Sequence, residues 1–253
     1  MEFTYKGYER LIDRLKDNGY RFADYKNYGD YDKCVILRHD VDYDLQKVTK
    51  MAEIEYEKGV SSTYFVLLTS EFYNVMSKDS GNIIKRLYQL GHQVGLHFDE
   101  KFYEISKSSW DEKTITRLVN HEIELLNDIV GRKTNAVSMH RPSKKMLESD
   151  FKFSGGAENS YGKEFFSGFK YLSDSRMRWR EDVEHVIVSG EYDRIQLLTH
   201  PFWYFDKQKE MKDIVEDFIY CRKEIAEHRY KVLNENITDL CNILNRSPKE
   251  ART

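Results

Sequence analysis

Two hydrophobic patterns alternate along most of the chain. Some segments repeat apolar residues every three or four positions and end at a glycine, which is typical of amphipathic helices. Short apolar runs lie between these segments and predict buried strands. The predicted helices cover residues 8–20, 44–59, 81–91, 111–131 and roughly 207–244. The predicted strands cover residues 34–40, 60–68, 92–99, 135–142, 169–175, 184–190 and 194–201.

Strands that alternate with crossover helices predict a parallel sheet. About seven strands in 253 residues favour an α/β fold whose sheet closes, or nearly closes, into a β/α barrel with outer helices. An open doubly wound sheet is the alternative, but no glycine-rich phosphate loop follows the first strand. We find no linker or repeat and expect residues 1–253 to form one domain, with the N-terminal helix and the C-terminal helical region packed on the barrel.

Composition and charge argue against several classes of function. A net charge of −3 and a pI near 6.3 provide no electrostatic basis for binding nucleic acid or an anionic membrane. The cysteines Cys34, Cys221 and Cys241 match no zinc spacing, and their odd number favours a reducing compartment. No apolar run approaches the ~18 residues of a membrane span, and the first residues lack the apolar core of a secretory signal. We therefore expect a cytoplasmic protein, and its oligomeric state stays open.

Acidic, basic and imidazole side chains gather at the ends of the predicted strands. In chain order they are Asp40 and Asp42, His97 and Asp99, His140 and Arg141, Asp174, and His200. In β/α barrels the carboxyl ends of the strands carry the chemistry, so these residues are expected at one mouth. Alternate side chains point to opposite faces of a strand, which places Asp40 and Asp42 on one face and His39 on the other. We expect His39 and His92 to be structural, and Asp44 to cap the next helix.

An aspartate and two or more histidines around an open position form the ligand set of a catalytic zinc or a similar divalent ion. A second carboxylate beside them could take a proton from a water whose pKa the metal lowers, to ~7 in good cases. A histidine on another strand could protonate a leaving group. The strand ends therefore predict metal-assisted acid–base chemistry.

Several short motifs resemble, in their order, those of the NodB-homology polysaccharide deacetylases, carbohydrate esterase family 4 and its relatives. The motifs are ILRHDVD, STYFV, GHQVGLHFD, HRP and LLTHP, and they extend from about residue 35 to residue 204. The most specific is GHQVGLH, because the family has Gly-His, a polar or acidic residue, an aliphatic residue, Gly, any residue and His at this place. The resemblance implies a distorted (β/α)7 barrel that removes acetyl groups from N-acetyl amino sugars. It also implies a divalent metal, with zinc expected first and manganese, cobalt or magnesium as alternatives.

The resemblance assigns roles to the first strand ends. The family closes its first strand with two adjacent acidic residues, a base followed by a metal ligand, whereas Val41 separates the two here. Asp40 resembles the base and Asp42 the ligand, although these two roles could be exchanged. His97 matches the first metal-binding histidine.

The resemblance also assigns roles to the later strand ends. Arg141 resembles the arginine that orients the base. His200 resembles the histidine that protonates the departing amine, and Asp174 resembles the acidic residue that tunes this histidine. Trp203 and Tyr204 follow His200 closely and could stack on a sugar.

One position departs from the family pattern. The second metal-binding histidine of the family falls four residues after the first, where this chain has Lys101. His140 is the first candidate for the missing ligand, and Asp99 is the second. A set with His140 would suit zinc, whereas a set with Asp99 would favour manganese or magnesium. The departure also leaves open a weak or lost metal site.

These observations predict a metal-dependent hydrolase that removes an N-acyl group, acetyl in the first instance, from an amino sugar. A cytoplasmic location favours a nucleotide- or lipid-linked precursor of a surface polysaccharide as the substrate. One alternative keeps the chemistry and changes the acyl group, giving a sugar deformylase. The other is a metal-free carbohydrate-binding or scaffolding protein derived from the fold, because the ammonium of Lys101 could repel a cation.

Overall fold

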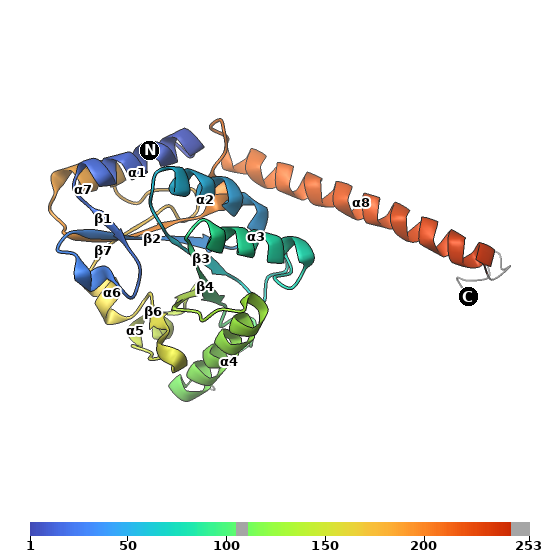
Figure 1. The fold of residues 1–253 in the computed structure, drawn as a ribbon, viewed down its shortest axis with the longest axis horizontal. Helices are drawn as coiled ribbons and strands as arrows, with labels where there is room; N and C mark the ends of the chain where they lie inside the picture. Colours follow the sequence, from blue (N-terminus) through green and yellow to red (C-terminus); the bar gives the residue numbers. More distant parts are fainter. Residues whose placement is uncertain (105–110, 244–253) are drawn as a thin grey trace. The chain divides into compact units, whose positions relative to one another are not determined.

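The computed structural model describes residues 1–104 and 111–243. Strand β2 (Cys34–Val41) is buried along its whole length and lies within an eight-stranded sheet (Figure 1). The other strands are β1 (Arg21–Ala23), β3 (Thr63–Val66), β4 (Gln93–Phe98), β5 (Ala136–Met139), β6 (Glu158–Asn159), β7 (Lys170–Ser173) and β8 (Arg194–Thr199).

The sheet has one path of strands in the order β6-β5-β4-β3-β2-β8-β7, and β1 pairs with the beginning of β2. All of these pairs are parallel. Among the described residues, the two end strands β6 and β7 are not paired with each other, and the rings of Tyr161 and Tyr171 approach to 6.3 Å between centroids beside them. This partly closed barrel confirms the predicted fold class, a distorted parallel (β/α)7 barrel.

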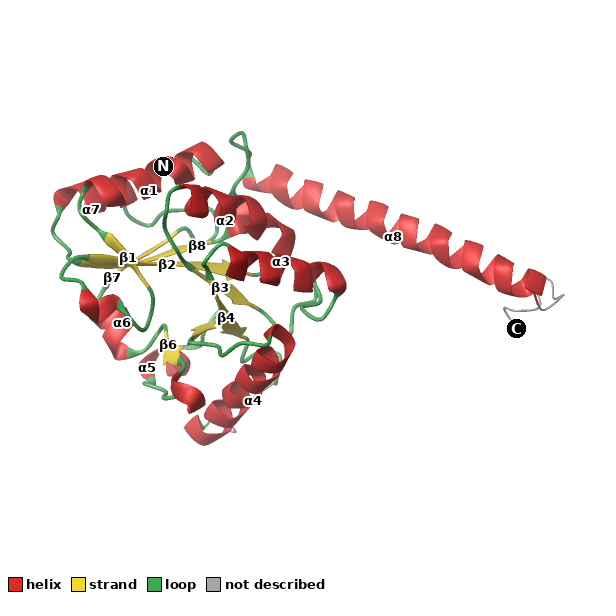
Figure 2. Cartoon of the chain, viewed as in Figure 1, coloured by secondary structure: helices red, strands yellow, loops and turns green. Residues whose placement is uncertain are grey.

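The helices within residues 1–208 cover the outside of the sheet (Figure 2). Most of them begin at a side-chain cap; Thr4, for example, accepts a hydrogen bond from the backbone N–H of Gly7 at 2.9 Å. Asp44 caps the 3-10 turn η2 (Leu45–Lys47), as predicted. The helices are α1 (Tyr5–Asp17), α2 (Val48–Glu57), α3 (Lys78–Gln89), α4 (Glu112–Val130), α5 (Lys144–Glu148), α6 (Lys163–Ser167), α7 (Val183–Ser189) and α8 (Met211–Ile243).

The two faces of β2 differ in chemistry. Cys34 and Ile36 belong to an apolar cluster inside the barrel, and Arg38 and Asp40 continue the same face toward the carboxyl end of the strand. Val41, on the opposite face, packs in the cluster that α2, α3 and α4 form against the sheet. The alternation therefore delivers polar side chains to the barrel mouth while the rest of the strand stays apolar.

The segment of residues 184–190 corrects one prediction, because it is helix α7 and not a strand. Asp182 accepts hydrogen bonds from the backbone N–H groups of Glu184 and His185, and Gly190 ends the helix with a φ of 65°. Val183, Val186 and Ile187 are buried at helical spacing. The β-branched residues suggested a strand, but the caps and one apolar face outweigh that propensity.

The chain divides into two compact units, Met1–Gln208 and Lys209–Thr253. The second contains α8, which confirms the predicted C-terminal helix, whereas its packing on the barrel stays a prediction. Within the described ranges, no helix is both long enough and apolar enough to cross a membrane.

Candidate active site

A buried ion pair stands at the base of the barrel mouth. The Nη2 atom of Arg38 donates to both carboxylate oxygens of Asp40, at 2.8 and 2.7 Å. Arg38 is fully buried and Asp40 is 4% exposed, so water screens the pair very little. Burial alone would raise the pKa of Asp40, but the charges of Arg38 and His97 outweigh it and lower the pKa below its usual range. Asp40 is therefore an ionised carboxylate at neutral pH.

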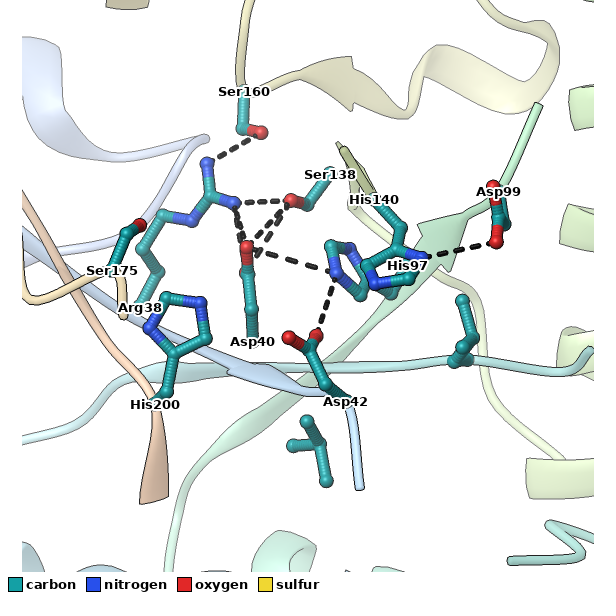
Figure 3. Close-up of polar contacts among 12 residues, drawn as sticks. Arg38, Asp40, Asp42, His97, Asp99, Ser138, His140, Ser160, Ser175 and His200 are labelled. Atoms are coloured by element: carbon teal, nitrogen blue, oxygen red, sulfur yellow. Dashed lines mark hydrogen bonds and ion pairs between the residues drawn. The ribbon is translucent and has the colours of Figure 1, made fainter. Parts of the chain in front are cut away.

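Arg38 is held in place from several sides (Figure 3). Its Nη1 atom donates to Ser160 Oγ at 2.8 Å, and its Nη2 atom also donates to Ser138 Oγ. The guanidinium lies 4.9 Å from the centroid of the Phe65 ring. Gly95 makes room for that ring, because a Cβ at this position would come within 2.5 Å of it. The second glycine of GHQVGLH thus serves the packing beneath the ion pair.

Asp42, His97 and His140 form a compact group of metal-competent side chains, with one ligand atom of each within 4.8 Å of the others. His97 Nε2 lies 3.2 Å from Asp42 Oδ1 and 3.8 Å from Asp40 Oδ2. Burial would raise the pKa of Asp42, but the hydrogen bond with His97 and the charge of His200 lower it well below its usual range. These groups come from the ends of β2, β4 and β5, as the strand-end pattern predicts.

The environment of His140 fits a metal ligand. Its Nδ1 atom lies 3.0 Å from Asp99 Oδ2, and because a carboxylate only accepts, Nδ1 carries the proton. The other nitrogen, Nε2, is buried and has no hydrogen-bond partner in the described part of the chain. Burial and the neighbouring His97 lower the pKa of His140, which favours the neutral imidazole that metals require. A carboxylate behind a histidine is the usual support for a metal-binding imidazole. The donor set therefore fits a divalent ion, with Asp99 behind His140.

His200 faces this group from the end of β8 and is paired with Asp174. Its Nδ1 atom lies 2.6 Å from Asp174 Oδ1, and its backbone N–H donates to Asp174 Oδ2 at 3.0 Å. Burial alone would lower the pKa of His200, but Asp174, together with Asp42 and Asp40, raises it to about 9. His200 is therefore protonated at neutral pH.

These side chains share one cavity of about 780 Å³. Its lining includes Asp40, Asp42, His97, His140 and His200, so the residues predicted from different strand ends do meet at one mouth. Asp174 is fully buried behind the cavity wall, where it binds His200.

Arg141 and Tyr204 do not take the positions expected of them. The guanidinium of Arg141 is exposed and donates to the hydroxyl of Tyr43 at 2.8 Å, while Arg38 holds Asp40 in the place expected of Arg141. Tyr204 is fully buried and donates to Asp174 Oδ2 at 3.0 Å, so its ring is not available to a substrate. Trp203, the residue before Tyr204, lines the cavity and is available to a substrate.

Arg38 and Ser138 are the residues that sequence reasoning missed. Arg38 precedes Asp40 by two positions on β2, and Ser138 precedes His140, which directly follows β5, by two positions, so period-two alternation puts each pair on the same face. That signal was present in the sequence. The strand register completes the arrangement, because His97 and Ser138 are direct partners across β4 and β5.

A second polar cluster lies on the outer face of β2. Glu55, fully buried, contacts His39 Nε2 at 2.8 Å, Ser62 Oγ at 2.6 Å and the Tyr64 hydroxyl at 3.0 Å. His92 Nε2 is 3.0 Å from the carbonyl oxygen of Ala52. His39 and His92 are therefore hydrogen-bonded inside the protein, in agreement with their predicted structural role.

No protein-family model matches the chain. One similar solved structure is a family 4 carbohydrate esterase from Bacillus anthracis, with 15% identity over 85% of this chain and 86% of that one and a TM-score of 0.42. A second is the peptidoglycan deacetylase PdaC from Bacillus subtilis, with 12% identity over 79% of this chain and 97% of that one and a TM-score of 0.41. A third is BA3943 from Bacillus anthracis, described as a pseudoenzyme of the CE4 family, with 14% identity over 76% of this chain and 61% of that one and a TM-score of 0.41. The solved structures similar to this chain thus include members of carbohydrate esterase family 4, the family whose motifs its sequence resembles.

Proposed function

We propose that the chain is a metal-dependent hydrolase that removes an N-acetyl group from an amino sugar. One observation carries the proposal: a carboxylate held by an arginine, a set of three metal-competent ligands and a histidine paired with a buried aspartate line the same cavity. Amide hydrolysis needs these three functions, namely a base for water, an electrophile for the carbonyl and an acid for the amine. The sequence motifs support the choice of an acetylated amino sugar.

Asp42, His97 and His140 would hold the metal, and the single carboxylate with two imidazoles favours zinc. When bound, a divalent ion supplies a Lewis acid that polarises the amide carbonyl and makes water more acidic. His140 would ligate through Nε2, since Asp99 occupies its Nδ1. The free second nitrogen and the supporting carboxylate favour His140 as the third ligand over Asp99.

Asp40 would act as the base. Arg38 binds its carboxylate from inside the barrel, so Asp40 stays ionised and keeps one orientation. Asp42, by contrast, belongs to the ligand group. This difference supports the assignment of Asp40 as base and Asp42 as ligand.

His200 would act as the acid. Asp174 binds its Nδ1 proton, which leaves Nε2–H for the cavity side. A pKa of about 9 keeps the imidazolium charged at neutral pH, ready to donate a proton to the nitrogen that leaves with the sugar. The indole of Trp203, in the wall of the same cavity, would pack against the sugar ring.

We propose a nucleotide- or lipid-linked sugar precursor as the substrate and the cytoplasm as the compartment. The cysteines Cys34, Cys221 and Cys241 are all free thiols, which suits a reducing environment. Removal of a formyl group in place of acetyl uses the same residues, so comparison of N-formyl and N-acetyl substrates decides between them.

The test combines metal content with amine release. Purified protein loaded with zinc should hold about one ion per chain and release amine from N-acetylated sugar precursors, and a chelator should abolish both. His97→Ala should lose metal and activity together. His121→Ala, an exposed histidine on α4, is the matched control and should change neither. Full metal content and activity in His97→Ala would contradict the proposal.

A metal-free carbohydrate-binding protein is the second candidate. Lys101 lines the same cavity as the ligand group, and an ammonium there opposes a bound cation. This candidate predicts substoichiometric metal after zinc loading together with retained binding of the sugar. Lys101→His should then raise the metal content.

A further inference from the structure

The cavity has a positively charged rim. Lys101, Arg141, Arg176 and Arg180 all line it and all are exposed, and we call these four residues the rim cations. The only carboxylates in the described lining are Asp40 and Asp42. Charges of both signs are otherwise mixed along the chain, with 40 basic and 43 acidic residues, so four cations around one opening are a local exception.

The rim cations are not neutralised by neighbouring carboxylates. Elsewhere on the surface basic side chains do find such partners, as Lys26 does with Glu158 at 2.6 Å and Lys170 with Glu181 at 2.6 Å. Within the described residues, no rim cation forms an ion pair. Asp40 also does not require them, because Arg38 already balances its charge from inside. The rim therefore has positive charge available to a ligand.

The backbone of the rim is strained at two of these positions. Arg141 has a φ of 47° and Arg176 a φ of 60°, in the left-handed region that disfavours residues with a Cβ. Such conformations cost free energy and tend to occur at functional sites, where the surrounding structure maintains them. They lie in separate loops, after β5 and after β7, and both residues line the cavity.

We propose that Arg141, Arg176 and Arg180, with Lys101, form a subsite for a phosphate or diphosphate group attached to the amino sugar. The inference rests on the proposed function, since it places the sugar between the rim and the catalytic residues. Guanidinium groups bind phosphate oxygens through paired N–H donors, and an ammonium adds a point charge. A single carboxylate on the sugar would need one of these groups, whereas a diphosphate can engage several.

The loop between β7 and α7 offers a matched control. It carries Arg176 and Arg180, which line the cavity, and Arg178, which is exposed and does not. An Arg178→Gln variant removes the same charge from the same loop. It therefore separates binding at the rim from a general loss of positive charge.

The experiment measures binding by calorimetry in the presence of a chelator, so that a metal cannot bind the phosphate. The probes are N-acetylglucosamine, its 1-phosphate, and its adducts with uridine diphosphate and with a short-chain prenyl diphosphate. We expect each phosphorylated probe to bind at least tenfold more tightly than the neutral sugar at low salt, with an advantage that shrinks as salt rises. The tighter of the two diphosphate adducts identifies a nucleotide or a lipid carrier.

The double variant Arg176→Gln, Arg180→Gln should lose at least tenfold in affinity for the phosphorylated probes, and Arg178→Gln should bind them like the parent. Equal affinity for neutral and phosphorylated sugar, an equal loss in Arg178→Gln, or no binding of any probe would each overturn the subsite. Binding does not depend on catalysis. A protein that binds the phosphorylated sugars more tightly but releases no amine would support the subsite and contradict the deacetylase. A protein that releases amine but binds neutral and phosphorylated sugars equally would support the deacetylase and contradict the subsite.

Discussion

Replacing Arg38 by methionine tests the buried ion pair of the candidate active site. Methionine keeps much of the aliphatic volume but leaves Asp40, which is 4% exposed, without its cation. Breaking a buried pair by removing one partner typically costs about 3–5 kcal/mol, because the remaining charge is uncompensated. The hydrogen bond from Arg38 to Ser160 is lost as well.

Protonation of Asp40 limits this cost and makes it depend on pH. An unfolded aspartate has a pKa of about 3.9, so keeping it protonated in the folded state at pH 7 costs about 4 kcal/mol, and at pH 5 about 1.5 kcal/mol. In the parent protein the pKa of Asp40 is lowered, so its contribution to stability is present above about pH 4 and is lost as the pH falls further. In Arg38→Met burial raises that pKa, and stability instead falls as the pH rises above about 4.

Urea unfolding at pH 5 and pH 7, followed by tryptophan fluorescence and with a chelator present, measures the effect. Trp179 and Trp203 belong to the described part of the first unit, so their fluorescence reports on the barrel. With a slope of roughly 2–3 kcal/mol per molar urea, the midpoint at pH 7 should fall by about 1–2 M.

The double variant Arg38→Met, Asp40→Asn is the control for the charge. It removes both ions, and it should be more stable than Arg38→Met alone by about 2 kcal/mol or more at pH 7. A loss below about 1 kcal/mol in Arg38→Met, or the same loss at both pH values, would refute the view that Arg38 maintains Asp40 as a buried anion.

Three further predictions concern the residues around the site. Asp174→Asn removes the charge that raises the pKa of His200 to about 9, so the alkaline limit of amine release should move down by about two pH units, measured as a pH–rate profile. The raised pKa of His200 also stabilises the fold below about pH 6.5, an effect that is lost as the pH rises through about 9, and urea midpoints across this window should flatten in the variant. Tyr204→Phe removes one hydrogen bond to Asp174 and should cost about 1 kcal/mol of unfolding free energy without changing the KM, whereas a large rise in KM would return Tyr204 to the substrate site. Glu55→Ala leaves His39 and its neighbours without their carboxylate and should cost about 3–5 kcal/mol, with Glu55→Gln losing less; equal stability in all three proteins would contradict the role of the cluster.

Period-two alternation and the parallel sheet explain why much of the site could be predicted. Asp40, Asp42 and His97 lie at the carboxyl ends of β2 and β4, which are separated by β3 in the parallel sheet, so all three gather at the same edge. The opposite face of β2 accounts in the same way for His39, which is buried against α2. These placements need only the order of the elements and the two-residue repeat.

Helix α7 shows where the local pattern was insufficient. Its run of β-branched residues resembles a strand, and the choice of helix depends on Asp182, on Gly190 and on which side chains the barrel can bury. Propensity is a weak prior that tertiary contacts override. The same applies to the short helices α5 and α6, which the sequence pattern does not distinguish from loops.

The sequence by itself determined the barrel and the strand ends that carry acids and imidazoles, because alternation and crossover order are properties of the chain. Only the tertiary structure decided the partners. Arg38 and not Arg141 holds Asp40, because the rings inside the barrel and the missing Cβ of Gly95 leave a space that fits a buried guanidinium. His140 joins the ligand group because the register of β4 with β5 brings it beside His97 and Asp99 fixes its ring. Such pairings depend on distances between strands, which no spacing along one strand contains.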